Sequence, residues 1–176
     1  HGGLRVQSWT DSHETLLKPD GTMPLYPFAP VEVQSYAWLS LKLWADFYET
    51  TDKEFAQNLN GFADNLKERF NEAFIFKDGE TFFAAQALDG MKNQIKTITG
   101  NPLITLWATY FSEGQKEIIL DEKYITDFVA RAFAPDMFSE NAGIRTMSKN
   151  SPTFNGTSNS YHNGSFWPKL NGMVYE

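Results

Sequence analysis

The strongest constraint on the fold of this chain is a pair of amphipathic segments separated by Thr51-Asp52. Across residues 32–50 the apolar side chains recur with a period of about 3.6 residues, which predicts a helix. We expect its buried face to consist of Val33, Tyr36, Ala37, Leu41, Trp44, Phe47 and Tyr48. Thr51-Asp52 predicts the N-terminal cap of a second helix over residues 52–73. Its expected apolar face consists of Phe55, Leu59, Phe62, Leu66 and Phe70. Together the two segments predict an antiparallel helical hairpin.

Further along the chain, shorter elements alternate with polar loops. A turn signal at Asp78-Gly79, within residues 74–83, predicts a small β-hairpin. Apolar spacing predicts helices over about 102–112 and 121–133, and Pro168 predicts the start of another helix. Residues 1–31 and 143–168 contain many glycine, proline and polar residues and predict long loops. The residues expected in the core because they lie within predicted helices are Trp38, which falls outside the apolar stripe, Trp44 and Trp107.

These elements predict an all-α fold in which helical hairpins are joined by long loops and one small β-hairpin. Stacked helical hairpins with loops at one end are typical of an α/α barrel or part of one. The pattern stops soon after Trp167-Pro168, in the middle of a predicted helix. We therefore expect residues 1–176 to be a partial α/α-barrel domain, truncated at both ends.

Composition argues against several classes of function. The net charge is −7 and no basic run is present, which disfavours nucleic acid and anionic membranes as partners. No apolar run is long enough to span a bilayer. The absence of cysteine removes thiol chemistry and disulfides, and fits a cytoplasmic location. The three histidines, His1, His13 and His162, lack the spacing of metal ligands, so we expect no metal and no other cofactor.

The predicted loops carry the residues that could perform chemistry. The first loop holds Trp9 and Asp11, and the next polar segment holds Asp89, Asn93 and Asn101. The last loop holds Arg145, Tyr161, His162, Asn163 and Trp167. Carboxylates and amides bind hydroxyl groups, and aromatic rings stack on the apolar face of a sugar. This set therefore favours a neutral, polyhydroxylated ligand.

Each of these residues also has a purely structural interpretation. Asp11 beside Trp9 suits a glycosidase general acid, because a nearby indole lowers local polarity. On spacing alone, an Asx turn is the commoner use of a loop aspartate. Glu32 and Gln34 suit the first turn and the surface of a helix without any ligand. The other open alternatives are a carboxylate partner for Arg145, a backbone-bonded loop position for His162 and a core position for Trp167.

Four ordered blocks of the sequence resemble the glucosidase domain of glycogen-debranching enzymes, the amylo-α-1,6-glucosidase family. The blocks are WTDSHETLLKPDGTM, APVEVQSYAW, ALDGMKNQIKTITGNP and AGIRTMSKNSPTFNGTSNSYHNGSFWP. The resemblance implies an (α/α)6 barrel and an inverting α-glucosidase that uses neither metal nor organic cofactor. It implies that Asp11 is the general acid. It further implies that the sugar site is lined by Trp9, Glu32, Gln34, Arg145, Tyr161, His162, Asn163 and Trp167.

The resemblance also implies that the base carboxylate lies beyond residue 176. The remainder of the barrel would then be a partner outside this chain, and this fragment alone would be inactive. The sequence departs from the family pattern at Ser35, at Leu103-Ile104 and at Lys169-Leu170-Asn171. These departures leave open a non-catalytic carbohydrate-binding barrel, or a related glycosidase of the trehalose or mannosylglycerate type.

Overall fold

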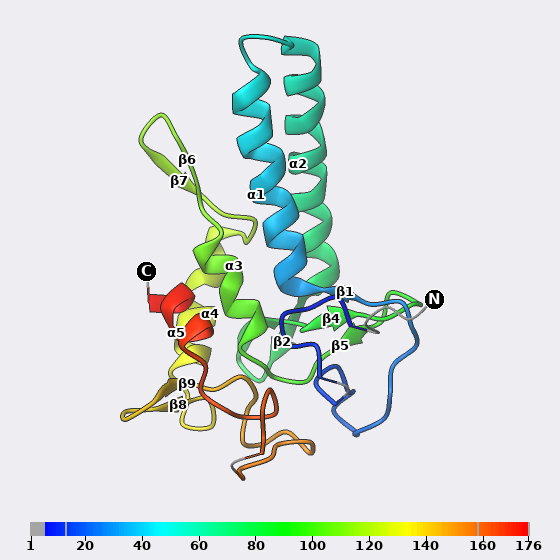
Figure 1. The fold of residues 1–176 in the computed structure, drawn as a ribbon, viewed down its shortest axis with the longest axis vertical. Helices are drawn as coiled ribbons and strands as arrows, with labels where there is room; N and C mark the ends of the chain where they lie inside the picture. Colours follow the sequence, from blue (N-terminus) through cyan, green and yellow to red (C-terminus); the bar gives the residue numbers. More distant parts are fainter. Residues whose placement is uncertain (1–5, 13, 158, 176) are drawn as a thin grey trace.

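The computed structural model describes residues 6–12, 14–157 and 159–175. Within these ranges the fold is mixed α/β, with five α-helices and four small antiparallel sheets. The all-α prediction is therefore wrong. The described residues form one long helical hairpin and several short elements, and no barrel is evident among them (Figure 1). None of the helices in the described part of the chain combines the length and apolarity needed to cross a membrane.

The predicted helical hairpin is confirmed. Helix α1 spans Val31–Tyr48 and helix α2 spans Lys53–Phe74. Asp52 caps α2 as expected, because its carboxylate accepts a hydrogen bond from the Phe55 backbone N–H at 3.0 Å. Figure 1 shows the two helices side by side along the long axis, with most of the sheets and loops at the end opposite their connecting turn.

The predicted buried face of α1 is wrong. Trp44 and Phe47, which were placed in the core, are exposed, whereas Trp38 is only 1% exposed. Two polar residues, Glu32 and Ser35, also face the interior. They can be buried because each finds a hydrogen-bond partner there: Glu32 binds Ser8, and Ser35 donates to the Glu32 backbone oxygen. The periodicity of apolar residues gives no information about hydrogen-bond partners elsewhere in the chain.

Short sheets surround the base of the hairpin. Strands β1 (Ala29–Pro30), β4 (Ala87–Leu88) and β5 (Gln94–Ile95) form a three-stranded antiparallel sheet. The predicted hairpin near Asp78-Gly79 is confirmed as β2 (Ile75–Asp78) paired with β3 (Thr81–Ala84). Gly79 has φ of +64°, a left-handed conformation that glycine adopts without strain.

The helix predicted over 102–112 is wrong. The chain forms a 3-10 turn, η1 (Asn101–Leu103), and a short helix, α3 (Ile104–Trp107). It then turns back on itself as β6 (Tyr110–Ser112) and β7 (Gln115–Glu117). The Tyr110 hydroxyl donates to Asp46 of α1 at 2.6 Å, which joins this strand pair to a distant helix.

The last part of the chain packs beneath the hairpin. The helix predicted over 121–133 is present as η2 (Glu122–Tyr124) followed by α4 (Ile125–Ala132). Strands β8 (Phe138–Ser139) and β9 (Gly143–Ile144) pair next, and α5 (Pro168–Tyr175) begins at the predicted proline. Phe128 of α4 contacts Phe83 of β3, with ring centroids 4.9 Å apart, and both are buried.

One close contact places η1 against α5. A Cβ on Gly100 would lie 2.4 Å from Leu170 Cδ2 and 2.9 Å from the Arg145 backbone oxygen. Only glycine therefore fits between these segments. Two isolated bridges, Thr99 to Met147 and Arg145 to Phe166, hold the loop before α5 at the same place. The residue after Gly100, Asn101, is fixed where the loops of the site meet.

The corrected face of α1 makes a direct prediction about stability. Trp38→Ala should lower the free energy of unfolding by about 3–5 kcal/mol, because it empties a fully buried position. Trp44→Ala should cost less than about 1 kcal/mol, because that side chain is 53% exposed. Urea denaturation followed by circular dichroism measures both. Equal losses of unfolding free energy in the two variants would show that Trp44 is buried like Trp38.

Candidate functional site

Four aromatic side chains gather where the loop before α1 meets the loop before α5. We call Trp9, Tyr161, His162 and Trp167 the aromatic cluster. The Trp9 ring centroid lies 5.4 Å from that of His162 and 6.0 Å from that of Trp167. Tyr161 and Trp167 lie 5.1 Å apart, edge to face. The Trp167 indole N–H donates to the Tyr161 backbone oxygen at 2.9 Å, which holds the two residues together. The structure thus joins residues separated by about 150 positions.

Asp11 lies at the edge of the aromatic cluster. Its Oδ1 is 3.9 Å from Nδ1 of His162, and its side chain is 41% exposed. The local turn is closed by the hydroxyl of Thr15, which donates to the backbone oxygens of Thr10 and Ser12 at 2.6 and 2.7 Å. The Asp11 carboxylate is therefore open to a ligand from the solvent side. It does not lie in the enclosed apolar surroundings that the neighbouring indole suggested.

His162 is buried and bound to a side chain rather than to backbone. Its Nδ1 lies 2.9 Å from the Ser12 hydroxyl. Burial lowers the pKa of His162, Lys169 lowers it further, and Asp11 acts in the opposite direction. A neutral imidazole carries one donor and one acceptor nitrogen, so at neutral pH His162 can orient the Ser12 hydroxyl and the Asp11 segment without adding charge.

Lys169 belongs to the site although sequence reasoning treated it only as a departure from a family pattern. Its Nζ lies 5.0 Å from the centroid of the Trp9 ring, a cation–π arrangement. The signal that could have identified it was its position directly after Trp167-Pro168, in the first turn of α5. A cation is thus present beside the aromatic cluster.

Glu32 supports the aromatic cluster from behind. The residue is fully buried, and its Oε1 accepts a hydrogen bond from the Ser8 hydroxyl at 2.5 Å. Its Oε2 has no hydrogen-bond partner among the described residues. Burial raises the pKa of Glu32, opposed by the Ser8 hydrogen bond and by Lys169. The neighbouring Tyr36 has its pKa raised to about 12, mainly by burial and further by Glu32.

The remaining predicted residues hold the scaffold together. Gln34 donates to the Pro30 backbone oxygen at 3.1 Å and so serves its own helix start. Asn163 donates to the Thr153 and Glu14 backbone oxygens at 3.2 and 3.5 Å. Arg145 donates to the Gly164 oxygen at 3.0 Å, and its guanidinium lies 4.2 Å from the Phe166 ring centroid. Arg145 therefore stacks on an aromatic ring, whereas the sequence offered a carboxylate or a ligand.

Metal binding finds no support in the described ranges, where no three histidine, aspartate or glutamate side chains converge. His1 and His13 lie outside the described residues. The expectation of no metal and no cofactor stays a prediction.

Two open grooves adjoin the aromatic cluster. One, of about 580 Å³, is lined by Asn159, Tyr161, Ser165, Phe166, Trp167 and Pro168. The other, of about 240 Å³, is lined by Ser12, Glu14, Asn155, Asn159, Ser160, Tyr161 and Asn163. Tyr161 borders both grooves. It is 57% exposed and has φ of +43°, an uncommon conformation for a residue with a side chain. Hydroxyl and amide groups therefore surround an exposed aromatic ring.

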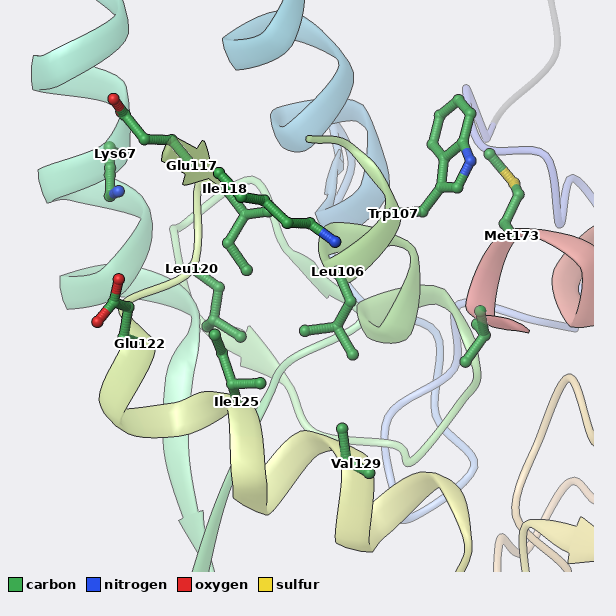
Figure 2. A pocket seen from close by; sticks show the side chains of 12 residues that line it. Lys67, Leu106, Trp107, Glu117, Ile118, Leu120, Glu122, Ile125, Val129 and Met173 are labelled. Carbon is green, nitrogen blue, oxygen red and sulfur yellow. The ribbon is translucent and has the colours of Figure 1, made fainter. Parts of the chain in front are cut away.

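A separate apolar groove lies on another part of the molecule. It encloses about 320 Å³ beside α3, α4 and α5, and none of the predicted site residues lines it. Figure 2 shows the side chains of Leu106, Leu120, Ile125 and Val129 directed into this groove. Lys67, Glu117 and Glu122 stand at its charged margin. Its lining carries no arrangement of acids and aromatic platforms like that around Asp11.

The buried Glu32 predicts a specific dependence of stability on pH. Because folding raises the pKa of Glu32, the native state binds more protons than the unfolded state above pH 4.5. The contribution of Glu32 to stability is therefore present at low pH and is lost as pH rises through its folded pKa. Glu32→Gln cannot titrate, so its free energy of unfolding should rise relative to wild type with increasing pH. Urea denaturation at a series of pH values measures the difference.

Glu54→Gln provides the matched control, since Glu54 is also a first-turn glutamate but is exposed on α2. A difference between wild type and Glu32→Gln that stays constant with pH would contradict the proposed burial cost.

Comparison with known proteins leaves the family open. Neither the protein-family models nor the curated proteins contain a match to this chain. The resemblance to debranching enzymes therefore rests on the four ordered sequence blocks. The structure brings together Trp9, Asp11, Tyr161, His162 and Trp167, which belong to the first and last of these blocks.

Proposed function

We propose that the aromatic cluster and Asp11 bind an α-linked gluco-oligosaccharide, and that Asp11 is the general acid of an inverting, debranching-type glycoside hydrolysis. The observation that supports this most is the position of an exposed carboxylate beside clustered aromatic rings. Aromatic faces suit the apolar C–H surface of a pyranose. The hydroxyl and amide groups of the adjoining grooves suit its hydroxyls.

In this proposal Asp11 protonates the departing glycosidic oxygen. Inverting hydrolysis also needs a second carboxylate about 6.5–9.5 Å away, which activates the attacking water on the opposite face of the sugar. The identity of that second carboxylate is also part of the proposal. The reaction needs no metal or organic cofactor. The absence of cysteine is consistent with action in the cytoplasm, which is also proposed.

Lys169 favours a second candidate within the same chemistry. Its ammonium lies over the Trp9 ring, and its positive charge acts on His162. A neutral glucan offers no partner for this charge, whereas a sugar acid such as mannosylglycerate carries a carboxylate. Anionic glycosides are therefore the alternative substrate class for the proposed glycosidase. A carbohydrate-binding protein without catalysis is the alternative activity.

The test compares Asp11→Asn with wild type, in the protein as encoded together with any sequence that flanks these residues. Substrates are α-1,4-, α-1,6- and α,α-1,1-linked glucosides and mannosylglycerate. Loss of the acid should lower turnover by roughly 10²- to 10⁴-fold while ligand affinity changes little, because the amide keeps the shape of the carboxylate. Sugar release and calorimetric binding are measured in parallel.

Asp64→Asn is the control, since Asp64 is an exposed aspartate of α2 outside the aromatic cluster. Near-normal turnover in Asp11→Asn would remove Asp11 from the acid role. Binding that survives in both variants, with no hydrolysis by wild type, would establish the non-catalytic alternative.

A further inference from the structure

A chain of buried hydrogen bonds lies directly behind the aromatic cluster. We call Ser8, Thr10, Glu32 and Asn101 the buried relay. The Asn101 amide donates to the Thr10 hydroxyl at 2.8 Å and lies 3.4 Å from the Ser8 hydroxyl. The Ser8 and Thr10 hydroxyls are 3.0 Å apart, and Ser8 donates to Glu32 at 2.5 Å. The buried relay therefore joins the first loop, the start of α1 and the start of η1.

The buried relay and the site share one short stretch of backbone. Along residues 8–11 the side chains alternate in their contacts. Ser8 and Thr10 bind inward, to Glu32 and Asn101. Trp9 and Asp11 face the other way and approach His162. Because neighbouring Cα atoms are about 3.8 Å apart, fixing the two inward side chains also fixes the backbone that carries the two outward ones.

Asn101 links the buried relay to the segment around Gly100. It is fully buried, and it follows Gly100, whose N–H donates to the Thr146 oxygen at 3.0 Å. Gly100 lies so close to Leu170 and the Arg145 backbone that a Cβ would not fit there. Thr146 in turn accepts a hydrogen bond from the Gly164 N–H at 3.0 Å, two residues after His162. The same anchor thus contacts both loops that form the aromatic cluster.

We infer that Asn101 is a positioning residue, which through Thr10 and Ser8 holds Trp9 and Asp11 in register against His162. The expected effect of Asn101 on ligand affinity rests on the proposed sugar-binding function. The expected effect of Asn101 on the distance between Asp11 and His162 is independent of that function, because the distance is a property of the ligand-free protein. Thr10 is 3% exposed, so loss of its hydroxyl leaves the buried Asn101 amide without this partner and favours a shift of the segment.

The test uses Thr10→Val, which keeps the shape of the side chain and removes the hydroxyl. Thr10→Ser restores the hydroxyl. Thr105→Val is the matched control, since Thr105 is equally buried but its hydroxyl donates only to the nearby Pro102 oxygen, at 2.7 Å. Proton NMR follows the titration of His162, assigned by its loss in His162→Gln. Oligosaccharide affinity is measured by calorimetry on the same samples.

Burial lowers the pKa of His162. Among the charged groups around it, Asp11 raises this pKa and Lys169 lowers it. If Thr10→Val lets Asp11 move away, the His162 midpoint should shift to lower pH than in wild type. Affinity should fall roughly ten- to a hundredfold, because a displacement near 1 Å suffices for such a loss. Thr10→Ser and Thr105→Val should titrate and bind as wild type does.

A wild-type titration of His162 in Thr10→Val would overturn the inference, even if the protein binds sugar. If Thr10→Val fails to fold, Asn101→Ala is judged by the same criterion. A shifted His162 midpoint in a protein whose wild type binds no sugar would support the positioning role and would remove the proposed function.

Discussion

The burial of Glu32 is the constraint on which the rest of this structure depends. A carboxyl group in the first turn of α1 can leave water only where it finds hydrogen-bond partners, and Ser8 supplies one at 2.5 Å. That bond joins the first loop to the start of α1. On the same buried face of α1 lie Val31, Trp38 and Ala45, whereas Trp44 and Phe47 are exposed. The position of the residues beside Ser8 thus depends on which face of α1 is buried.

The site separates into side chains that face solvent and side chains that hold them. Asp11 and Tyr161 are exposed and Trp9 is partly buried beside them, whereas Arg145 and Asn163 donate hydrogen bonds to neighbouring backbone oxygens. Arg145 and Asn163 are polar, as ligand-binding residues are. Because they donate hydrogen bonds within the protein, they hold the loops in shape. A sequence motif can therefore include residues that support the loop as well as residues that are free to contact a ligand.

Local sequence signals predicted local structure well. The helix boundaries of α1 and α2, the cap at Asp52 and the turn at Asp78-Gly79 all depend on residues within a few positions of each other. Prediction was wrong where distant partners intervene. Tyr110 lies in a strand and bonds Asp46, although a helix is predicted there. Glu32 is buried and bonds Ser8, although it is not part of the apolar face predicted for α1. The all-α fold class was wrong for the same reason, since most of the short strands are defined by pairing that periodicity does not report.

By itself the sequence determined the long helical hairpin, the turn at Asp78-Gly79 and where the polar loops lie. Periodicity, caps and turn residues are local, so their outcome needs no partner elsewhere. Only the tertiary structure decided that Trp9 and Asp11 lie against His162, that Lys169 covers Trp9 and that Asn101 anchors the segment between them. Those contacts join residues about 90 to 160 positions apart. Their geometry depends on the close approach of Gly100 to Leu170 and on the burial of Glu32 against Ser8, which no local pattern encodes.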